Sequence, residues 1–369
     1  MHIKTFAGVY PNLAQIKHSM PSFFNKVKAA YPKLRKAGAF LQTPDAYFIY
    51  QIQGKKHSYT GVIACLDVRD FLEGRILRHE RTLAAEEEKQ MRFLLERRAT
   101  VKPVLMTYSN AQPLDTWIAD YARSHQPFLE IPLKKNETHR LWLVSEVAPQ
   151  EALSMLFEEH VARVYIADGH HRTACSALLY KQLQAEENPT ITYDRFLCAL
   201  FPESELAIME FNRVVYALDE MDAATLLKRL EAICTVERLK KKRKPRKKHE
   251  MTLFIGEDCY RLNWKQAVLD TYVGLPAVLD TALLNDKILK NILGIEDVRT
   301  DRRVSYVEGP KGHRAIVQKI RKEPANIGFC LFPISASELF AVADAGEVLP
   351  PKSTWFEPRM KNGLLVQEF

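Results

Sequence analysis

Four ionisable side chains surround one glycine in the stretch Asp168-Gly169-His170-His171-Arg172. Residues 161–167 before it are mostly apolar and rich in β-branched side chains, which predicts a buried strand. Residues 173–183 after it contain good helix formers and neither Gly nor Pro, which predicts a helix. Free N–H groups at a helix N-terminus attract anions, and an arginine beside them can bind phosphate oxygens in a bidentate manner. The sequence therefore predicts phosphate chemistry at this junction.

Each polar residue of the stretch suits a role in that chemistry. Arg172 and the helix N-terminus would neutralise phosphate oxygens, and His170 or His171 would move a proton or stabilise the transferred group. Asp168 would orient a histidine, bind magnesium or accept a proton from a substrate hydroxyl. The alternative is structural: Asp168 would accept backbone N–H bonds in a turn, and the histidines would form a hydrogen-bonded pair. The packing of four such residues around one glycine favours the functional interpretation.

A second polar cluster, His79-Glu80-Arg81-Thr82, precedes a predicted helix over residues 84–98. It again places a histidine, a carboxylate and an arginine at a possible strand-to-helix junction. The alternative is that Thr82 is a helix N-cap and that the three residues before it form a surface ion-pair cluster. The sequence alone leaves both interpretations open.

Other familiar sites lack their sequence patterns in this chain. It contains no G-x-x-x-x-G-K-[ST] or G-x-G-x-x-G loop, and neither G-x-S-x-G nor H-E-x-x-H. His170 and His171 are adjacent and would point in different directions on a strand or a helix, so both could bind one metal only in an irregular turn. A site of His79, Asp168 and one of these histidines is the weaker alternative, and we predict no metal ligands. The six cysteines show neither metal-ligand nor redox spacing, so we expect free thiols and a cytoplasmic protein.

The composition is that of a globular protein. Of 369 residues, 47% are hydrophobic and 27% charged, and we expect two or three domains. No stretch approaches the roughly 18 apolar residues of a membrane span, so we expect no membrane partner.

The net charge of +8 depends on one segment, because nine of the basic residues lie between Arg238 and Lys248 and the net charge would be −1 without them. One interpretation is a loop that attracts polyanions, and the other is a solvated loop between two strands at 232–236 and 251–255. The segment holds no aromatic residue, and Pro245 prevents a regular helix, so we favour the solvated loop and expect no nucleic-acid partner.

The pattern of elements predicts an α/β (α+β) protein with a mixed sheet. We expect an N-terminal α/β region over residues 1–150, a core with the Asp168–Arg172 stretch over 151–235, and a C-terminal α/β segment over 236–369. In the last segment, a helix over 280–293 should break at Gly294. Ser335 and Glu338 should form a capping box at the start of another helix, which Gly346 should end.

Four blocks, in order along the chain, resemble a family known as domain of unknown function 1015 (DUF 1015). The resemblance extends over nearly the whole chain from about Phe40. The blocks are Tyr165-Ile166-Ala167-Asp168-Gly169-His170-His171-Arg172-Thr173-Ala174, His79-Glu80-Arg81-Thr82-Leu83, His139-Arg140-Leu141-Trp142 and the run from Gly346 to Pro358 that contains Lys352-Ser353-Thr354.

That family is similar to the ParB and sulfiredoxin group, one branch of which phosphorylates free serine. The resemblance implies a ParB-like core that binds nucleotide phosphate at Gly169, Arg172 and Thr173, with ATP or ADP, optionally Mg²⁺, and serine or phosphoserine as the small-molecule substrate. Either direction of phosphotransfer is compatible with the residues. It also implies that His79, Glu80 and Arg81 form a second wall of the site. A third wall would come from Lys352, Ser353 and Thr354.

The N-terminal region departs from the family pattern. The chain lacks the family's N-terminal Pro-Tyr-Asp-type block, and it has no acidic residue before Asp45, where the serine kinases place their base. Either Glu80 or Asp168 would then act as the base. The alternatives are an inactive protein that senses a nucleotide or phosphometabolite and, ranked last, a nucleic-acid-binding ParB-like module.

Overall fold

The chain divides into two compact units, which we describe separately. The computed structural model describes residues 1–55, 57–134, 136–189, 191–219 and 221–369. Unit 1 comprises Met1–Ala207 and Pro358–Phe369, and unit 2 comprises Ile208–Glu357. The segment boundaries expected near residues 150 and 235 fall inside unit 1 and unit 2, because strands from both sides of each boundary pair in the same sheet. Each unit combines helices with a sheet, which confirms the expected α/β class.

Unit 1 is built on one mixed sheet, as expected. β10 pairs in parallel with β5 and antiparallel with β7, and β11 pairs in parallel with β7 and antiparallel with β4. The order of hydrogen-bonded strands is β5-β10-β7-β11-β4-β3-β2-β19-β6, with β1 beside β4 and with β9 joining β3 to β8. The strands are β1 (Ile3–Lys4), β2 (Phe6–Pro11), β3 (Phe40–Gln53), β4 (Ser58–Asp67), β5 (Ile76–Leu77), β6 (Ala99–Thr100), β7 (Val104–Tyr108), β8 (Leu129–Lys134), β9 (Glu137–Val144), β10 (Val164–Asp168), β11 (Arg195–Pro202) and β19 (Val366–Glu368).

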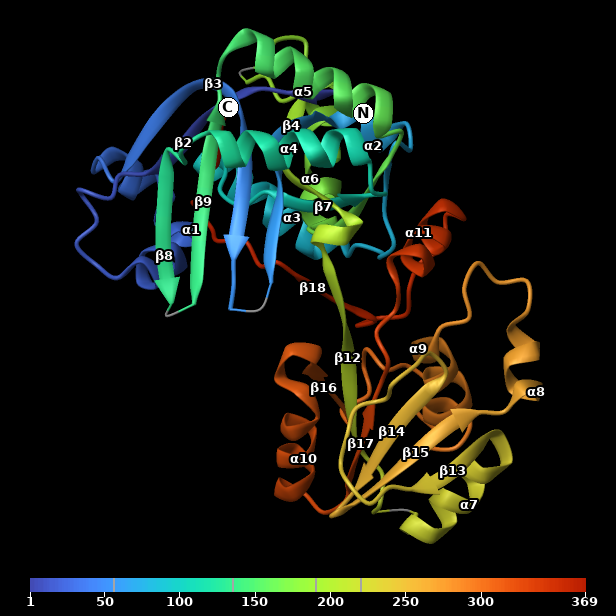
Figure 1. Ribbon diagram of the computed structural model, residues 1–369. Helices are drawn as coiled ribbons and strands as arrows, with labels where there is room; N and C mark the ends of the chain where they lie inside the picture. The colour runs from blue at the N-terminus through green and yellow to red at the C-terminus, as the bar shows by residue number, and fades with distance from the viewer. Residues whose placement is uncertain (56, 135, 190, 220) are drawn as a thin grey trace. The chain divides into compact units, whose positions relative to one another are not determined.

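Two pairs of helices pack on this sheet. Helices α4 and α5 lie side by side over the sheet, and α3 packs against α6 (Figure 1). The apolar faces of α4 and α5 are buried through Leu114, Ile118, Leu153 and Phe157. The helices are α1 (Met20–Lys36), α2 (Val68–Leu72), α3 (Ala84–Arg97), α4 (Gln112–Ser124), α5 (Val147–His160) and α6 (His170–Ala185).

The last residues of the chain belong to unit 1. β19 pairs with both β2 and β6, and the Gly363 N–H donates to the Val101 carbonyl at 2.6 Å. Tyr31 and Arg35 of α1 bind the carboxylate of Glu368. The segment 358–369 is therefore fixed within unit 1 along its length.

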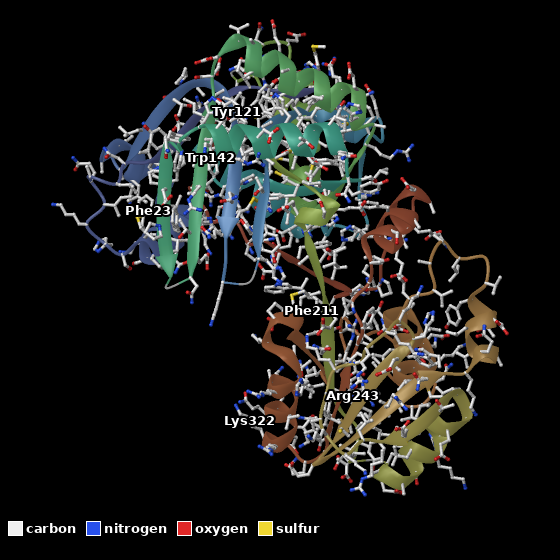
Figure 2. The ribbon with its side chains drawn as sticks, viewed as in Figure 1. Phe23, Tyr121, Trp142, Phe211, Arg243 and Lys322 are labelled. Carbon is white, nitrogen blue, oxygen red and sulfur yellow. The ribbon has the colours of Figure 1, made fainter. Side chains whose placement is uncertain are left out.

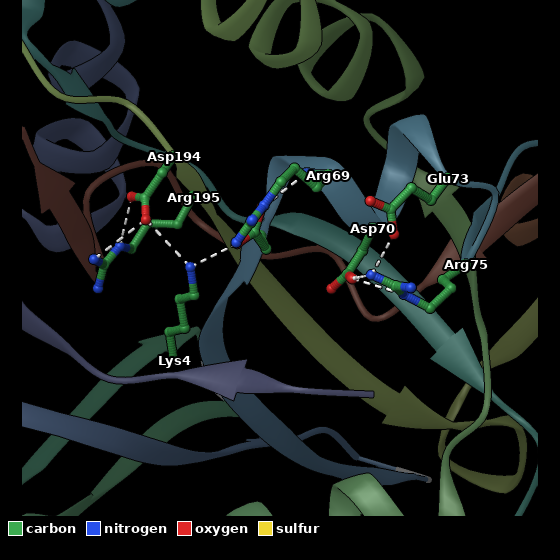
Figure 3. Close-up of polar contacts among 8 residues, drawn as sticks. Lys4, Arg69, Asp70, Glu73, Arg75, Asp194 and Arg195 are labelled. Atoms are coloured by element: carbon green, nitrogen blue, oxygen red, sulfur yellow. Dashed lines mark hydrogen bonds and ion pairs between the residues drawn. The ribbon is translucent and has the colours of Figure 1, made fainter.

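An ion-pair network ties the start of the chain to the ends of two strands. Lys4 Nζ lies 2.7 Å from Asp67 and 3.2 Å from Asp194, and Arg69 also pairs with Asp67 (Figure 3). Asp67 also caps α2 by accepting the Arg69 N–H. Burial alone would raise the pKa of Asp67, but the hydrogen bonds from Arg69 and Lys4 lower it below its ordinary value. The network thus joins β1, β4, α2 and the start of β11.

The sheet of unit 2 has a separate core on each face. On one face, Ile316, Val317 and Ile320 of α10 pack with Val214 and Phe254. On the other face, helices α7 and α9 pack with the neighbouring positions of the same strands. The strand order is β13-β15-β14-β17-β12-β16, with β18 beside β12. The elements are β12 (Ala207–Tyr216), α7 (Ala223–Ile233), β13 (Cys234–Arg238), β14 (Glu250–Ile255), β15 (Asp258–Trp264), α8 (Gln266–Leu269), α9 (Asp280–Leu283), β16 (Val304–Glu308), α10 (Gly312–Lys322), β17 (Asn326–Cys330), α11 (Ala336–Asp344) and β18 (Thr354–Glu357).

Several local expectations for the C-terminal part are confirmed. Ser335 and Glu338 form the capping box of α11. The chain has a positive φ at Gly294 and at Gly346, the two expected helix ends. The helix expected over residues 280–293 begins as α9 but continues as a π-helix from Leu284 to Lys290. All six cysteines are free and buried. Within the described ranges, we find no helix that is long and apolar enough to cross a membrane.

The basic segment 238–248 connects β13 to β14, as expected for a loop between two strands. Six of its nine basic residues are exposed, as expected for a solvated loop, but part of the charge is neutralised within unit 2. Five of the nine basic side chains pair with carboxylates, namely Arg238 with Asp258, Lys242 with Glu257, Arg243 with Glu250, Lys244 with Glu210 and Lys248 with Glu338. Glu210 and Glu250 are buried, so the segment, which includes the labelled Arg243 (Figure 2), is part of the packed structure.

Candidate functional site

The predicted strand-glycine-helix junction is present in unit 1. β10 ends at Asp168 and α6 begins at His170, three residues earlier than expected, so that His170, His171 and Arg172 form the first turn of the helix. The connecting Gly169 has a φ of +121°. A Cβ atom there would lie 2.7 Å from Arg172 Nη2. Glycine is thus needed both for the backbone conformation and for the close approach of the arginine.

Arg172 binds the protein's own backbone beside the junction. The strand expected over 101–108 begins only at Val104, after a gap at residues 101–103 that contains Pro103, which cannot donate to a strand ladder. The carbonyls of Lys102 and Pro103 accept hydrogen bonds from Arg172 Nη1 at 2.8 and 2.7 Å. Arg172 Nη2 donates to the carbonyl and the carboxylate of Asp168. The side chain predicted to clamp phosphate therefore ties the junction to the β6–β7 connection.

Three cations surround the carboxylate of Asp168. Its Oδ2 lies 3.1 Å from Arg172 and 3.2 Å from Lys102, and its Oδ1 lies 3.4 Å from Arg359. Burial alone would raise the pKa of Asp168, but these positive charges lower it below its ordinary value. One negative charge against three positive charges leaves an excess of positive charge at the N-terminus of α6. Such an arrangement attracts anions.

Sequence reasoning missed Lys102 and Arg359. Lys102 stands in a stretch predicted to be a strand, and only the following Pro103 signals that the ladder breaks there. Arg359 directly follows the family-like block that ends at Pro358. Its position next to that block could have marked Arg359 as a candidate site residue, but no local sequence pattern relates it to Asp168.

Two buried imidazoles lie beside the junction. The rings of His79 and His170 are 4.5 Å apart and nearly perpendicular. Burial lowers the pKa of His170 to about 3 and that of His79 well below its ordinary value, so both are neutral near pH 7. His170 Nδ1 lies 3.6 Å from Glu80 Oε2, whose side chain is 57% exposed. The structure therefore brings the two predicted clusters together.

The remaining predicted residues near the junction are placed differently. His171 Nε2 accepts the Leu83 N–H at 3.3 Å, and the hydroxyl of buried Thr173 lies against the Gly169 carbonyl. Arg81 is exposed. Leu83, not Thr82, is the N-cap residue of α3, so the N-cap alternative for Thr82 was wrong. Lys352, Ser353 and Thr354 belong to unit 2, and their role as a third wall stays a prediction.

The His139 block forms a buried chain of polar contacts that reaches the C-terminal tail. The Tyr50 hydroxyl lies 2.6 Å from His139 Nδ1, and His139 Nε2 lies 3.0 Å from Glu137. Glu137 pairs with Lys361 at 2.7 Å. The hydrogen bond from His139 and the pair with Lys361 lower the pKa of Glu137 to about 2. Since Lys361 is two residues from Arg359, this chain helps to fix the segment that reaches Asp168.

The residues at the junction do not fit a magnesium site as they stand. Both carboxylate oxygens of Asp168 are already paired with cations. Over the part of the chain that the structure describes, no group of three or more His, Cys, Asp or Glu side chains is arranged to hold a metal ion. The carboxylate of Asp168 is therefore not available to a magnesium ion in this arrangement.

Comparison with known proteins identifies a family. A family model described as "Protein of unknown function (DUF1015)" matches residues 9–282, which confirms the predicted resemblance and includes the Asp168–Arg172 junction. Similar solved structures include a free serine kinase in complex with AMP (14% identity, 82% of this chain, 92% of that chain, TM-score 0.37). SbnI with a C-terminal truncation from Staphylococcus aureus (13%, 83%, 87%, TM-score 0.44) and a conserved hypothetical protein from Pyrococcus furiosus (13%, 82%, 95%, TM-score 0.37) are also similar. These likenesses are too low to carry over what those proteins bind. No curated protein matches the chain.

Proposed function

We propose that this chain, which belongs to the DUF1015 family of proteins of unknown function, binds nucleotide phosphate at the β10–α6 junction and transfers a phosphoryl group. The acceptor or donor is a small hydroxylated metabolite, with serine or phosphoserine as the first to test. The observation that carries the proposal is the carboxylate of Asp168 faced by three cations at the start of α6. The proposed location is cytoplasmic.

In this proposal, the phosphate binds to Lys102, Arg359 and the first N–H groups of α6. Lys102 and Arg359 both pair with Asp168, whereas Arg172 also holds two backbone carbonyls. A phosphate that approaches the helix N-terminus would draw Lys102 and Arg359 toward it, while Arg172 keeps the junction in place. Arg172 is then a positioning residue.

Glu80 is the better candidate for the base. Three cations lower the pKa of Asp168, which makes that carboxylate a weak proton acceptor. Glu80 is more exposed and lies beside His170, whose neutral ring can orient it. In the forward direction, the hydroxyl oxygen of serine would attack the γ-phosphorus of ATP. Glu80 would accept the hydroxyl proton, and ADP would leave.

Binding without transfer is the second candidate function. It is favoured by the ion pairs of Asp168, because both of its carboxylate oxygens already contact cations. Asp168 is then not available for the proton transfer with a histidine that the sequence predicted. A sensor of this kind would keep Lys102 and Arg359 but show no turnover. The nucleic-acid module ranks last, because carboxylates neutralise five side chains of the basic segment.

Incubation with Mg²⁺ and either ATP plus serine or ADP plus phosphoserine, followed by mass spectrometry, tests the proposal. We expect transfer by the unmodified chain and loss of transfer, with nucleotide binding retained, in Glu80→Gln. Glu88→Gln, which changes an exposed glutamate on α3, is the matched control. Nucleotide binding without any transfer would favour the sensor.

A further inference from the structure

A polar pocket in unit 1 lies between the end of α4 and the sheet. It has a volume of about 460 Å³, and its floor carries Gln51, Thr60, Glu130 and Arg140. Pockets that hold small ligands have volumes of roughly 300–1,000 Å³. In the sheet, β7, β11, β4 and β3 lie between β10 and β9, the strand of Arg140. This hollow, which we call the α4 pocket, is therefore separate from the β10–α6 junction.

The floor of the α4 pocket is a row of four directly paired residues. Gln51 of β3 stands opposite both Thr60 of β4 and Arg140 of β9. Arg140 in turn stands opposite Glu130 of β8. Paired residues project from the same face of a sheet, so all four side chains share one face. Neighbouring strands are about 4.8 Å apart, and the row therefore extends for roughly 14 Å.

Hydrogen bonds join the row but leave donors and acceptors free. Gln51 Nε2 donates to Thr60 Oγ1 at 3.1 Å, and Arg140 Nη1 donates to Gln51 Oε1 at 3.3 Å. Arg140 Nε donates to Glu130 Oε2 at 2.6 Å. Among the residues that the structure describes, Arg140 Nη2 has no acceptor and Glu130 Oε1 has no donor. The floor thus offers both N–H groups and oxygens to a ligand.

The end of α4 and the loop that follows it form the walls. Ala119, Ala122 and residues 125–127 line the pocket together with Trp142. Trp142, labelled in Figure 2, is 5% exposed, and its Nε1 donates to the His125 carbonyl at 3.0 Å. His125 Nδ1 lies 3.0 Å from a backbone carbonyl of α4. These contacts hold the loop in place, so the row lies in a walled pocket rather than on a flat sheet face.

The charges around the α4 pocket are balanced. Arg140 pairs with Glu130, and Arg123, which also lines the pocket, pairs with Asp120 at 2.9 Å. A charged ligand would therefore find no opposite charge in excess. Hydroxyl groups both donate and accept, so they match the free N–H groups of Arg140 and the free oxygen of Glu130. A row of roughly 14 Å is longer than a free amino acid and suits hydroxyl groups spread over sugar rings.

We propose that the α4 pocket binds a neutral sugar of one or two rings. Arg140 Nη2 and Glu130 Oε1 bind hydroxyl groups at one end of the sugar, and Gln51 and Thr60 bind hydroxyl groups further along the row. The small side chains of Ala119 and Ala122 leave room for the rings. This binding goes beyond phosphoryl transfer at the β10–α6 junction and does not depend on it.

Calorimetry with glucose and with maltose tests the proposal on the full chain. We expect one equivalent of bound sugar. Gln51→Met and Arg140→Lys should each weaken maltose binding about tenfold, because each removes hydrogen-bonding groups from the row. The matched control is Gln53→Met. Gln53 also accepts a hydrogen bond from Arg140 Nη1, at 2.6 Å, but lies outside the pocket, so this variant should bind maltose as the unmodified chain does.

NMR locates the bound sugar and shows that the variants are folded. The indole N–H signal of Trp142, identified by its loss in Trp142→Phe, should shift with maltose and should not shift with serine. The shift should persist in Lys102→Met/Arg359→Met, which alters only the junction.

The proposal is refuted if neither sugar binds, or if Gln53→Met loses as much affinity as Gln51→Met. It is also refuted if serine or gluconate shifts the Trp142 signal and the neutral sugars do not. None of these results affects the phosphotransfer assay with serine, so the two proposals can fail separately.

Discussion

Arg359 Nη1 lies 3.4 Å from Asp168 Oδ1, although the two residues are 191 positions apart in the sequence. The contact exists because the last segment of the chain returns to unit 1. Lys361 in the same segment pairs with Glu137, which is held in turn by His139. The positive charge at the α6 N-terminus therefore depends on the C-terminal segment 358–369, which is also held by the contacts of Lys361, Glu137 and His139.

Removing the second tail contact should weaken the site from a distance. Lys361→Met breaks the pair with Glu137 and should reduce nucleotide binding several-fold, because Arg359 loses part of its positioning. A double-mutant cycle with Glu137→Gln should give a coupling energy of about 1 kcal/mol in urea denaturation. A coupling energy near zero would mean that the pair does not hold the tail.

Gly169→Ala should destabilise the protein and abolish nucleotide binding. The new Cβ would meet Arg172 at 2.7 Å in a backbone conformation that alanine rarely adopts. We expect a loss of about 3 kcal/mol in the free energy of unfolding. Gly38→Ala is the control, since Gly38 also has a positive φ but nothing lies within 4 Å of its added Cβ. That variant should lose about 1 kcal/mol and bind normally. Equal losses in both would show that Arg172 is not constrained by the glycine.

Stability should fall in mild acid because His170 is buried in its neutral form. Burial lowers the pKa of His170 from the ordinary 6.5 to about 3, so the unfolded chain takes up a proton that the folded protein excludes. The unfolded state then binds more protons below pH 6.5, and the free energy of unfolding should drop by about 2 kcal/mol by about pH 5. Urea denaturation at several pH values measures this. His170→Asn should show a smaller pH dependence over that range, and an unchanged dependence would contradict the assignment.

Lys244→Met should destabilise unit 2 although it removes a charge from a crowded basic segment. Lys244 pairs at 2.7 Å with Glu210, whose side chain is 4% exposed, and the variant would leave that carboxylate buried with its cation removed. We expect a loss of about 2 kcal/mol, less than for a fully buried pair because Lys244 is partly exposed. Lys247→Met, at an exposed position of the same segment, should leave thermal stability unchanged. Comparable losses in the two variants would argue against the pairing.

The sequence predicted the junction because its signals are local. A β-branched run, a glycine and a helix-forming run determine where β10 ends and α6 begins, and the structure differs only by starting the helix at His170. The resemblance implied that the His79 block forms a second wall beside the Asp168 block. The rings of His79 and His170 lie in contact, but the role of the block in a phosphate site stays a prediction.

The remaining features depend on contacts that no local pattern encodes. Arg172 is of the residue type that commonly binds phosphate, but here it donates to the backbone carbonyls of Lys102 and Pro103. The cations Lys102 and Arg359 reach Asp168 only through the fold. The basic segment is largely exposed, as predicted. Its ion pairs were not predicted, because carboxylate partners such as Glu210 and Glu338 lie in distant strands and helices.

Nucleotide binding by the cations around Asp168 is the central claim, and calorimetry with ADP tests it most directly. Lys102→Met and Arg359→Met should each weaken ADP binding about tenfold, which corresponds to about 1.4 kcal/mol for one charge-assisted contact. Arg123→Met is the control, because Arg123 forms an exposed pair with Asp120. Affinities within twofold of the unmodified chain for both variants, or no ADP binding by the unmodified chain, would contradict the account.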